Sequence, residues 1–205
     1  MDPIYKQRKV NVDHGGECML KSGPKIYACQ LILDPNTTNP NLLLSEGNRK
    51  VTWVEGEEHY EDHLDRFDYH PQVLCRESLS RSRFYWEVEW HSGNTVIGVV
   101  YKGISRKSEG WDSRIGANRM SWSLYCSDNG YYFYHAGLPR SPIPGCVSHR
   151  VGVYLDWPAG TLSFYSVSSS GELNHIHTYY TTFTEPVYPG FRIYKDSSLS
   201  LCHLE

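Results

Sequence analysis

The sequence has little of what membrane, secreted and nucleic-acid-binding proteins depend on. Its 205 residues contain no apolar run near the roughly 20 residues that a membrane helix needs. Lys and Arg number 20 against 23 Asp and Glu, so the formal net charge of -3 gives no overall attraction to nucleic acid or to an anionic membrane. Because Met1–Val10 is polar and charged, we expect no signal peptide and a cytoplasmic location.

Cysteine is present, but not in the pattern of a metal site. The six cysteines lie at positions 18, 29, 75, 126, 146 and 202, and no two form a C-x-x-C pair. Because we expect no signal peptide, buried free thiols are favoured over disulfides. Two histidine pairs could each supply half of a metal site, but neither has a third ligand at diagnostic spacing. They are His59 with His63, and His175 with His177. We predict no metal and no cofactor.

Signatures of common enzymes are also missing. The chain has no G-x-S-x-G motif, and Gly103, Gly110 and Gly116 are too sparse for a phosphate-binding loop. Glu87 and Glu89 are the most enzyme-like pair, since alternate strand residues project to one side about 6.6–7 Å apart, within reach of glycosidase geometry. No third carboxylate follows in phase. We therefore interpret both as part of a solvated strand face and predict no enzyme.

The sequence is rich in short alternating segments. Aromatic residues make up 14% of the chain, with 16 Tyr and 6 Trp, which favours strands over helices. About twelve segments alternate apolar and polar residues between frequent turn signals, and none has a convincing helical period. They cover 28–33, 42–44, 50–54, 72–75, 83–90, 95–101, 121–126, 131–135, 151–155, 161–165, 173–178, 187–193 and 199–203. This pattern predicts an all-β protein, a two-layer antiparallel β-sandwich.

The stretch 150–167 is the clearest of these elements. Apolar residues alternate over 151–155 and again over 161–165. Between them, Pro158 presets φ in the turn and Gly160 permits a positive φ. We predict a tight antiparallel hairpin with a fixed register.

The hairpin sequence resembles a known family. Residues 150–165, RVGVYLDWPAGTLSFY, resemble the signature hairpin of PRY-SPRY domains. LILDPNT at 31–37 resembles the opening of the PRY part, and VLCRE at 73–77 with FYWEVEW at 84–90 resembles the start of the SPRY part. TEPVYPGF at 184–191 resembles the closing strand.

These matches follow the family's order over about residues 28–205. Together with YKGISRK at 101–107, they look most similar to the C-terminal modules of NLR-type immune receptors, tripartite-motif proteins and stonustoxin-like proteins. The resemblance implies a concanavalin-like jelly roll with a PRY part over about 28–69 and a SPRY part over about 70–205, after a tail or linker at 1–27.

The resemblance also implies a function. It predicts a non-catalytic protein-recognition module, the ligand-sensing C-terminal domain of a larger innate-immunity protein with signalling or ligase domains upstream. Loops 55–69, 102–119 and 136–148 are expected to gather at one edge and bind the protein partner. Exposed aromatic residues offer a large contact area at a low entropic cost. We predict partner contacts from Tyr60, His63, Trp111, Tyr125 and Tyr132.

Three alternatives stay open. In the first, the basic loop 102–119 senses a small anionic ligand through Lys102, Arg106, Arg114 or Arg119. The lysines and arginines of this loop, which include Lys107, can instead pair with the acidic loop 55–68. In the second, the sandwich binds or hydrolyses glycans. In the third, the chain is a module of a secreted pore-forming toxin.

Overall fold

The structure is a computed structural model that describes residues 23–139 and 147–204. A short 3-10 helix, η1 (Gly23–Tyr27), precedes the strands. The strands are β1 (Leu42–Ser45), β2 (Lys50–Trp53), β3 (Gln72–Leu74), β4 (Arg83–His91), β5 (Thr95–Tyr101), β6 (Ser121–Ser127), β7 (Gly130–His135), β8 (Leu138–Pro139), β9 (Arg150–Asp156), β10 (Thr161–Val167), β11 (Leu173–Tyr180), β12 (Val187–Ile193) and β13 (Ser198–Leu201). Within these residues, no helix is long and apolar enough to span a membrane.

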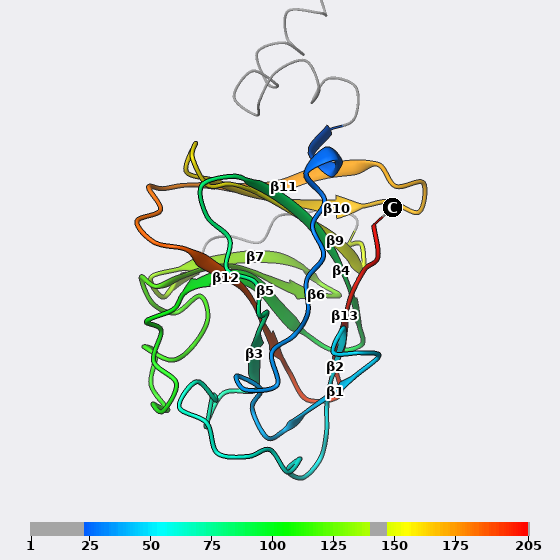
Figure 1. The fold of residues 1–205 in the computed structure, drawn as a ribbon. Coiled ribbons are helices and arrows are strands. Elements are labelled where there is room, and N and C mark those ends of the chain that lie inside the picture. The colour runs from blue at the N-terminus through cyan, green and yellow to red at the C-terminus, as the bar shows by residue number, and fades with distance from the viewer. Residues whose placement is uncertain (1–22, 140–146, 205) are drawn as a thin grey trace, which may run out of the picture.

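The strands form two sheets that pack face to face (Figure 1). One sheet has seven strands in the order β1-β2-β13-β4-β9-β10-β11, and the other has six in the order β3-β12-β5-β6-β7-β8. All neighbouring strands are antiparallel. The predicted all-β, two-layer antiparallel sandwich is confirmed.

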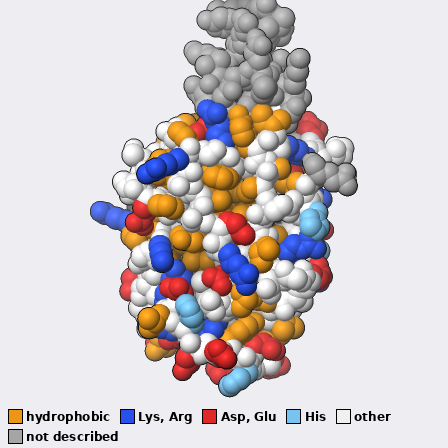
Figure 2. All heavy atoms as spheres, in the orientation of Figure 1, with side chains coloured by type: hydrophobic (Ala, Val, Ile, Leu, Met, Phe, Trp, Pro, Cys, Tyr) orange, Lys and Arg blue, Asp and Glu red, His pale blue; other side chains and the backbone are white. Residues whose placement is uncertain are grey.

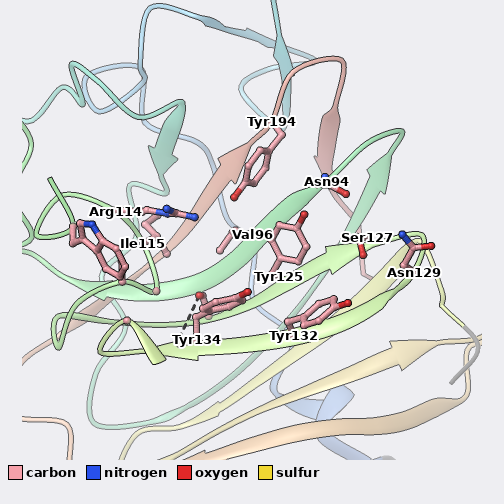
Figure 3. Close-up of a pocket in the computed structure, with 15 residues that line it drawn as sticks. Asn94, Val96, Arg114, Ile115, Tyr125, Ser127, Asn129, Tyr132, Tyr134 and Tyr194 are labelled. Atoms are coloured by element: carbon pink, nitrogen blue, oxygen red, sulfur yellow. Dashed lines mark hydrogen bonds between the residues drawn. The ribbon is translucent and has the colours of Figure 1, made fainter. Parts of the chain in front are cut away.

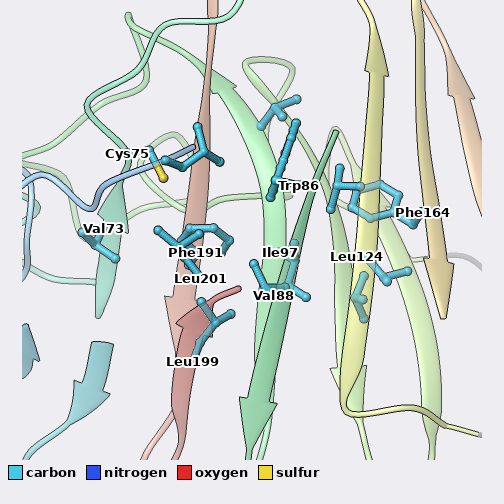
Figure 4. Close-up of a cluster of buried hydrophobic side chains, with 14 of the residues drawn as sticks. Val73, Cys75, Trp86, Val88, Ile97, Leu124, Phe164, Phe191, Leu199 and Leu201 are labelled. Carbon is cyan, nitrogen blue, oxygen red and sulfur yellow. The ribbon is translucent and has the colours of Figure 1, made fainter. Parts of the chain in front are cut away.

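The core fills the space between the two sheets (Figure 4). Trp86 and Val88 of β4 point into it from the seven-stranded sheet, where the sequence predicts an aromatic core face. Ile97, Leu124 and Phe191 meet them from the six-stranded sheet, and each is fully buried. Alternation in each strand therefore sends the other set of side chains to the two outer faces.

The predicted hairpin over 150–167 forms as expected, and a second hairpin joins β1 and β2. In the β9–β10 turn, Gly160 has a φ of 71°, and the amide of Ala159 donates to Oδ1 of Asp156 at 3.0 Å. In the β1–β2 turn, Gly47 and Asn48 have φ values of 66° and 61°. Residues that tolerate left-handed backbone thus fix the register of both hairpins.

The segment predicted as a first strand, 28–33, is extended but joins neither sheet as a strand. Ala28 forms an isolated bridge with Tyr85 of β4, and Leu33 forms one with Cys75 beside β3. The segment therefore passes from one sheet to the other. Because its two ends pair with different sheets, no ladder can extend along it.

The prediction that Glu87 and Glu89 share a solvated face is wrong for Glu87, whose side chain is only 1% exposed. Its Oε1 accepts a hydrogen bond from the Tyr85 hydroxyl at 2.7 Å, and its Oε2 lies 2.6 Å from Nε of Arg150. Nζ of Lys25 lies 3.4 Å from Oε1. Glu87 is thus the buried anion of a polar cluster, which removes it from any catalytic pair with Glu89.

The two ends of the described chain cover this face of β4. Tyr27 of η1 and Leu204 pack against Tyr85 and Tyr154, which are both fully buried. Directly opposite Glu87 on β9 lies Gly152, where an added Cβ would come within 2.4 Å of the Tyr85 hydroxyl. The alternation within β4 cannot reveal this burial, because the covering segments are remote in sequence.

The four described cysteines, Cys29, Cys75, Cys126 and Cys202, carry free thiols, and positions 18 and 146 lie outside the described residues. Burial raises the pKa of all four thiols, to about 11 for Cys29 and Cys202. Since the thiolate is the reactive form, we expect iodoacetamide to label fully buried Cys75 and Cys126 slowly in the native protein and rapidly after denaturation. Peptide mass spectrometry measures both rates, and fast native labelling would contradict this burial.

Candidate functional site

A pocket lies on the outer face of the six-stranded sheet, away from the core (Figure 3). Along β6 the core takes Leu124 and Cys126, so the alternate residue Tyr125 points outward, as the sequence predicts. Tyr132 of β7 is paired directly opposite Tyr125, and Tyr134 follows on the same side. Two adjacent strands thus give the pocket an aromatic floor.

Four tyrosines pack edge to face in this floor. The ring centroid of Tyr125 lies 5.8 Å from Tyr132, 6.3 Å from Tyr134 and 5.7 Å from Tyr194, which follows β12. Burial, and then the neighbouring Tyr194, raises the pKa of the Tyr125 and Tyr134 phenols. Both phenols therefore stay protonated at neutral pH and can donate hydrogen bonds to a ligand.

The loop between β5 and β6 forms one wall of the pocket. The side-chain amide of Asn118 donates to the carbonyls of Trp111 at 2.9 Å and Arg114 at 2.8 Å, which closes the loop on itself. Its oxygen accepts from the amide of Met120 at 3.0 Å. The side chains of Trp111 and Arg114 are thus presented from a hydrogen-bonded turn.

Gln72 of β3 holds the same loop from the sheet side. Its side-chain nitrogen donates to the carbonyl of Ser113 at 2.9 Å, and its oxygen accepts from the amide of Ile115 at 2.9 Å. Gln72 is fully buried, and these two hydrogen bonds satisfy both of its polar atoms within the protein. The resulting cavity has a volume of about 520 Å³ and ends at Asn94 and Asn129, opposite Arg114.

The structure brings part of the predicted partner site together. Trp111, Tyr125 and Tyr132 all line the pocket, and the Trp111 side chain is 66% exposed. Tyr60 and His63 do not line it. The Tyr60 hydroxyl donates to the carbonyl of Leu42 at 2.8 Å, which gives Tyr60 a structural role.

Loop 55–69 is acidic and irregular, but buried side chains anchor it. Arg66 donates to the carbonyls of Pro35, Thr38 and Glu61 at 2.6–2.7 Å, and Phe67 is fully buried. Figure 2 shows acidic and histidine side chains gathered at the end of the molecule where this loop lies. His63 is exposed there, with its Nδ1 3.9 Å from a carboxylate oxygen of the adjacent Asp65.

The four residues predicted to bind a small anion do not share one cavity. Arg114 lines the tyrosine pocket, whereas Lys102 and Arg106 line a separate hollow of about 200 Å³ that also contains Asp34 and Asp65. The Arg106 guanidinium donates to the carbonyls of Ile104, Asp65 and Lys102, which ties its charge to the loop backbone. Arg119 is exposed and lines neither cavity.

The predicted pairing between the basic and acidic loops holds for one cation. Nζ of Lys107 lies 2.7 Å from Oδ1 of Asp68 and donates to the carbonyl of His63 at 3.1 Å. Loop 136–148 is described only at 136–139 and 147–148, and Gly137 lines the pocket. Within the described residues, no group of three possible metal ligands is found.

Sequence reasoning missed Asn94 and Tyr194 as pocket residues. Tyr194 sits near the end of a strand in which Tyr188, Arg192 and Tyr194 alternate with core residues, and this alternation is the available signal. It shows that these side chains face outward. It does not show that β12 and β6 flank the same strand, β5, which brings Tyr194 against Tyr125.

His70 contacts the loop that forms a wall of the pocket, through the carbonyl of Gly110, and we predict that it contributes to the pH dependence of stability. Burial lowers the pKa of His70 below its ordinary 6.5, with Arg192 and Arg114 adding to the effect, while its hydrogen bond with the Gly110 carbonyl opposes it. The unfolded chain therefore takes up the proton first, and stability falls as the pH drops through about 6.5 toward the folded-state pKa. We expect His70→Gln to lose less stability than wild type between about pH 7.5 and about pH 5 in urea titrations. Equal losses in the two proteins would contradict this role.

Comparison with known proteins shows which family of domains this chain matches. A profile of the SPRY-associated domain, PRY, matches residues 31–79, and a profile of the SPRY domain matches residues 83–203. Stonustoxin subunit beta of Synanceia horrida is 46% identical over 170 residues, which cover 82% of this chain and 24% of that protein. Tripartite motif-containing protein 16 of Mus musculus is 39% identical over 170 residues, which cover 82% of this chain and 30% of that protein.

A solved structure shares the fold. The crystal structure of the TRIM65 PSpry domain superimposes with a TM-score of 0.81 at 26% identity, covering 93% of this chain and 99% of that domain. This chain therefore spans less than a third of the two curated relatives and nearly the whole of the isolated domain.

Proposed function

This chain belongs to the PRY-SPRY family, and we propose that it is a protein-recognition module whose tyrosine pocket receives part of a partner protein. The observation that carries the proposal is the pocket itself. Tyr125, Tyr132, Tyr134 and Tyr194 surround a cavity of about 520 Å³ on the outer face of a sheet. Aromatic anchors on a rigid scaffold typically dominate the energy of protein interfaces.

The rim beside the pocket supports a macromolecular partner. Leu64, Tyr69 and Trp111 are 87%, 54% and 66% exposed, and all three lie on loops 55–69 and 102–119. Lys107 links these loops through Asp68 and His63, and His70 contacts the carbonyl of Gly110. The two linked loops therefore present exposed apolar side chains, with Trp111 at the pocket and Leu64 and Tyr69 on the neighbouring loop, which adds surface beyond what a small ligand covers.

The proposal includes a biological setting, which the tripartite-motif relative supports. We propose that the domain senses a protein ligand as the C-terminal part of a larger cytoplasmic innate-immunity protein. The tripartite-motif relative is longer than this chain, which leaves room for signalling or ligase domains elsewhere in the parent. The domain itself then supplies recognition, and the catalytic or signalling output lies in those other domains.

A second candidate is favoured by the 46% identity with a stonustoxin subunit. In that case the chain is a module of a secreted toxin assembly, and the pocket faces another subunit of the assembly. A disulfide found by non-reducing mass spectrometry in the natural protein supports this candidate. Free thiols at all six positions support the intracellular one.

Quantitative capture from cell lysate tests the recognition function. We compare wild type with Tyr125→Ala and with a matched control, Tyr180→Ala, whose tyrosine is 82% exposed on β11 of the other sheet. Thermal melting confirms that both variants are folded. Removing a hot-spot aromatic costs about 2 kcal/mol, so we expect Tyr125→Ala to weaken capture roughly thirtyfold and Tyr180→Ala to retain it. If Tyr125→Ala still captures the same partners, the recognition site lies elsewhere.

A further inference from the structure

One end of the tyrosine pocket carries positive charge without a counter-charge. Among the described residues that line the cavity, Arg114 is the one charged side chain, and none is Asp or Glu. Figure 3 shows its guanidinium turned toward Val96 and Tyr194. Within the described residues, no carboxylate lies within ion-pair distance of Arg114.

A second arginine lies behind the first. The guanidinium carbon of Arg192 lies 4.7 Å from the ring centroid of Tyr194, and its Nη1 is buried with no hydrogen-bond partner in the described chain. Burial, and then the charge of Arg114, lowers the pKa of Arg192. The same two arginines act on His70. Neither arginine has a carboxylate of the described chain within ion-pair distance.

Two other arginines, on the opposite face of the sandwich, are paired with carboxylates, whereas buried Arg66 and Arg106 donate to backbone carbonyls. On that opposite face, Nε of Arg83 lies 2.8 Å from Oδ2 of Asp156, and Nε of Arg150 lies 2.6 Å from Oε2 of Glu87. Each has a buried carboxylate as its partner. Because desolvated like charges repel, an anion at Arg114 would be stabilised by both arginines, and the described residues do not supply a carboxylate there.

The rest of the pocket does not suit a compact polyanion. Beyond Arg114 the described lining is uncharged, with four tyrosines beside apolar and small residues. The far end holds Asn94 and Asn129, whose side-chain amides make no hydrogen bond within the described residues. Amide side chains match the alternating donors and acceptors of a peptide backbone. We propose that the pocket binds an extended acidic peptide of the partner, with an Asp or Glu side chain at Arg114 and the peptide backbone over the tyrosines. This inference rests on the proposed function and names its ligand class.

Selection from a random peptide display library tests this inference. The baits are wild type, Arg114→Gln and a control, Arg119→Gln, whose arginine is exposed outside the pocket. We expect peptides selected on wild type and on Arg119→Gln to share an acidic residue at one position, and Arg114→Gln to lose that preference. Arg114→Glu should exchange the preference for Lys or Arg at the same position. The inference would be overturned if the selected peptides had no fixed acidic position, or if Arg114→Gln left the preference for an acidic residue unchanged.

A double-mutant cycle on one selected peptide assigns the contact. Replacing its acidic residue by the amide, or Arg114 by Gln, should each weaken binding about tenfold, and the two changes together should weaken it no further. Additive losses would place the carboxylate elsewhere.

The other outcomes distinguish failure of this inference from failure of the proposed function. If neutral peptides are selected and Tyr125→Ala abolishes their binding, the pocket is the recognition site but its ligand is not acidic. No selected peptide at all would count against both, as would peptides insensitive to Tyr125→Ala. If no acidic peptide is selected, and inorganic phosphate raises the melting temperature of wild type but not of Arg114→Gln, the site is a small-anion sensor instead.

Discussion

Glu87→Ala should lower the free energy of unfolding by about 3 kcal/mol. The carboxylate is 1% exposed and holds the Tyr85 hydroxyl, Arg150 and Lys25 together on the outer face of β4. Removing a buried anion leaves its partners without their charge-assisted hydrogen bonds, which typically costs 3–5 kcal/mol. The lower end applies because the Arg150 and Lys25 side chains are 40% and 39% exposed and can reach water. A chain of this size should then melt about 6–12 °C lower.

Glu89→Ala is the matched control, since it removes the same side chain two residues further along the same strand. Glu89 is only half-buried, and no described residue donates a hydrogen bond to its carboxylate. Substitutions of this kind usually change stability by no more than about 0.5 kcal/mol. Urea denaturation measures both variants. Small and equal losses would show that Glu87 is solvated after all.

Gly160→Ala should cost about 3 kcal/mol or more. A Cβ at this position would lie 1.9 Å from the backbone carbonyl oxygen of Thr181, and the residue has a φ of 71°. The amide of Thr181 also donates to the carbonyl of Gly160 at 2.8 Å, so the clash cannot be relieved without disturbing that bond. The β9–β10 hairpin and the chain that follows β11 must therefore separate.

Gly47→Ala separates the clash from the backbone strain. Gly47 has a φ of 66°, close to that of Gly160, but nothing lies within 4 Å of an added Cβ. It should lose only the cost of a left-handed alanine, about 1 kcal/mol. Thermal melting of the two variants gives the difference directly, and equal losses would mean that residue 181 does not approach the turn.

Local alternation was sufficient to predict the sandwich. Trp86 and Val88, or Leu124 and Cys126, show which face of a strand enters the core, and Gly160 shows where the chain reverses. Alternation does not show what covers the other face. Glu87 was therefore predicted to be solvated, because the residues that bury it come from the two ends of the described chain.

The candidate site was predicted in part for the same reason. Trp111, Tyr125 and Tyr132 were predicted because exposed aromatic residues are visible within one hairpin or loop. Tyr60 has the same appearance in sequence, yet its hydroxyl is bonded to the backbone of β1. Tyr194 joins the pocket only through the order of strands in the six-stranded sheet, which the sequence does not display.

The central claim is that the partner contacts the tyrosine pocket, and photo-crosslinking tests it most directly. A benzophenone amino acid is placed at Tyr132 in the pocket and, as the control, at Tyr180 on the opposite sheet, in cells that contain the candidate partners. The account predicts a defined crosslinked protein from position 132 and none from position 180. Crosslinking from position 180 alone, or the same protein from both positions, would contradict it.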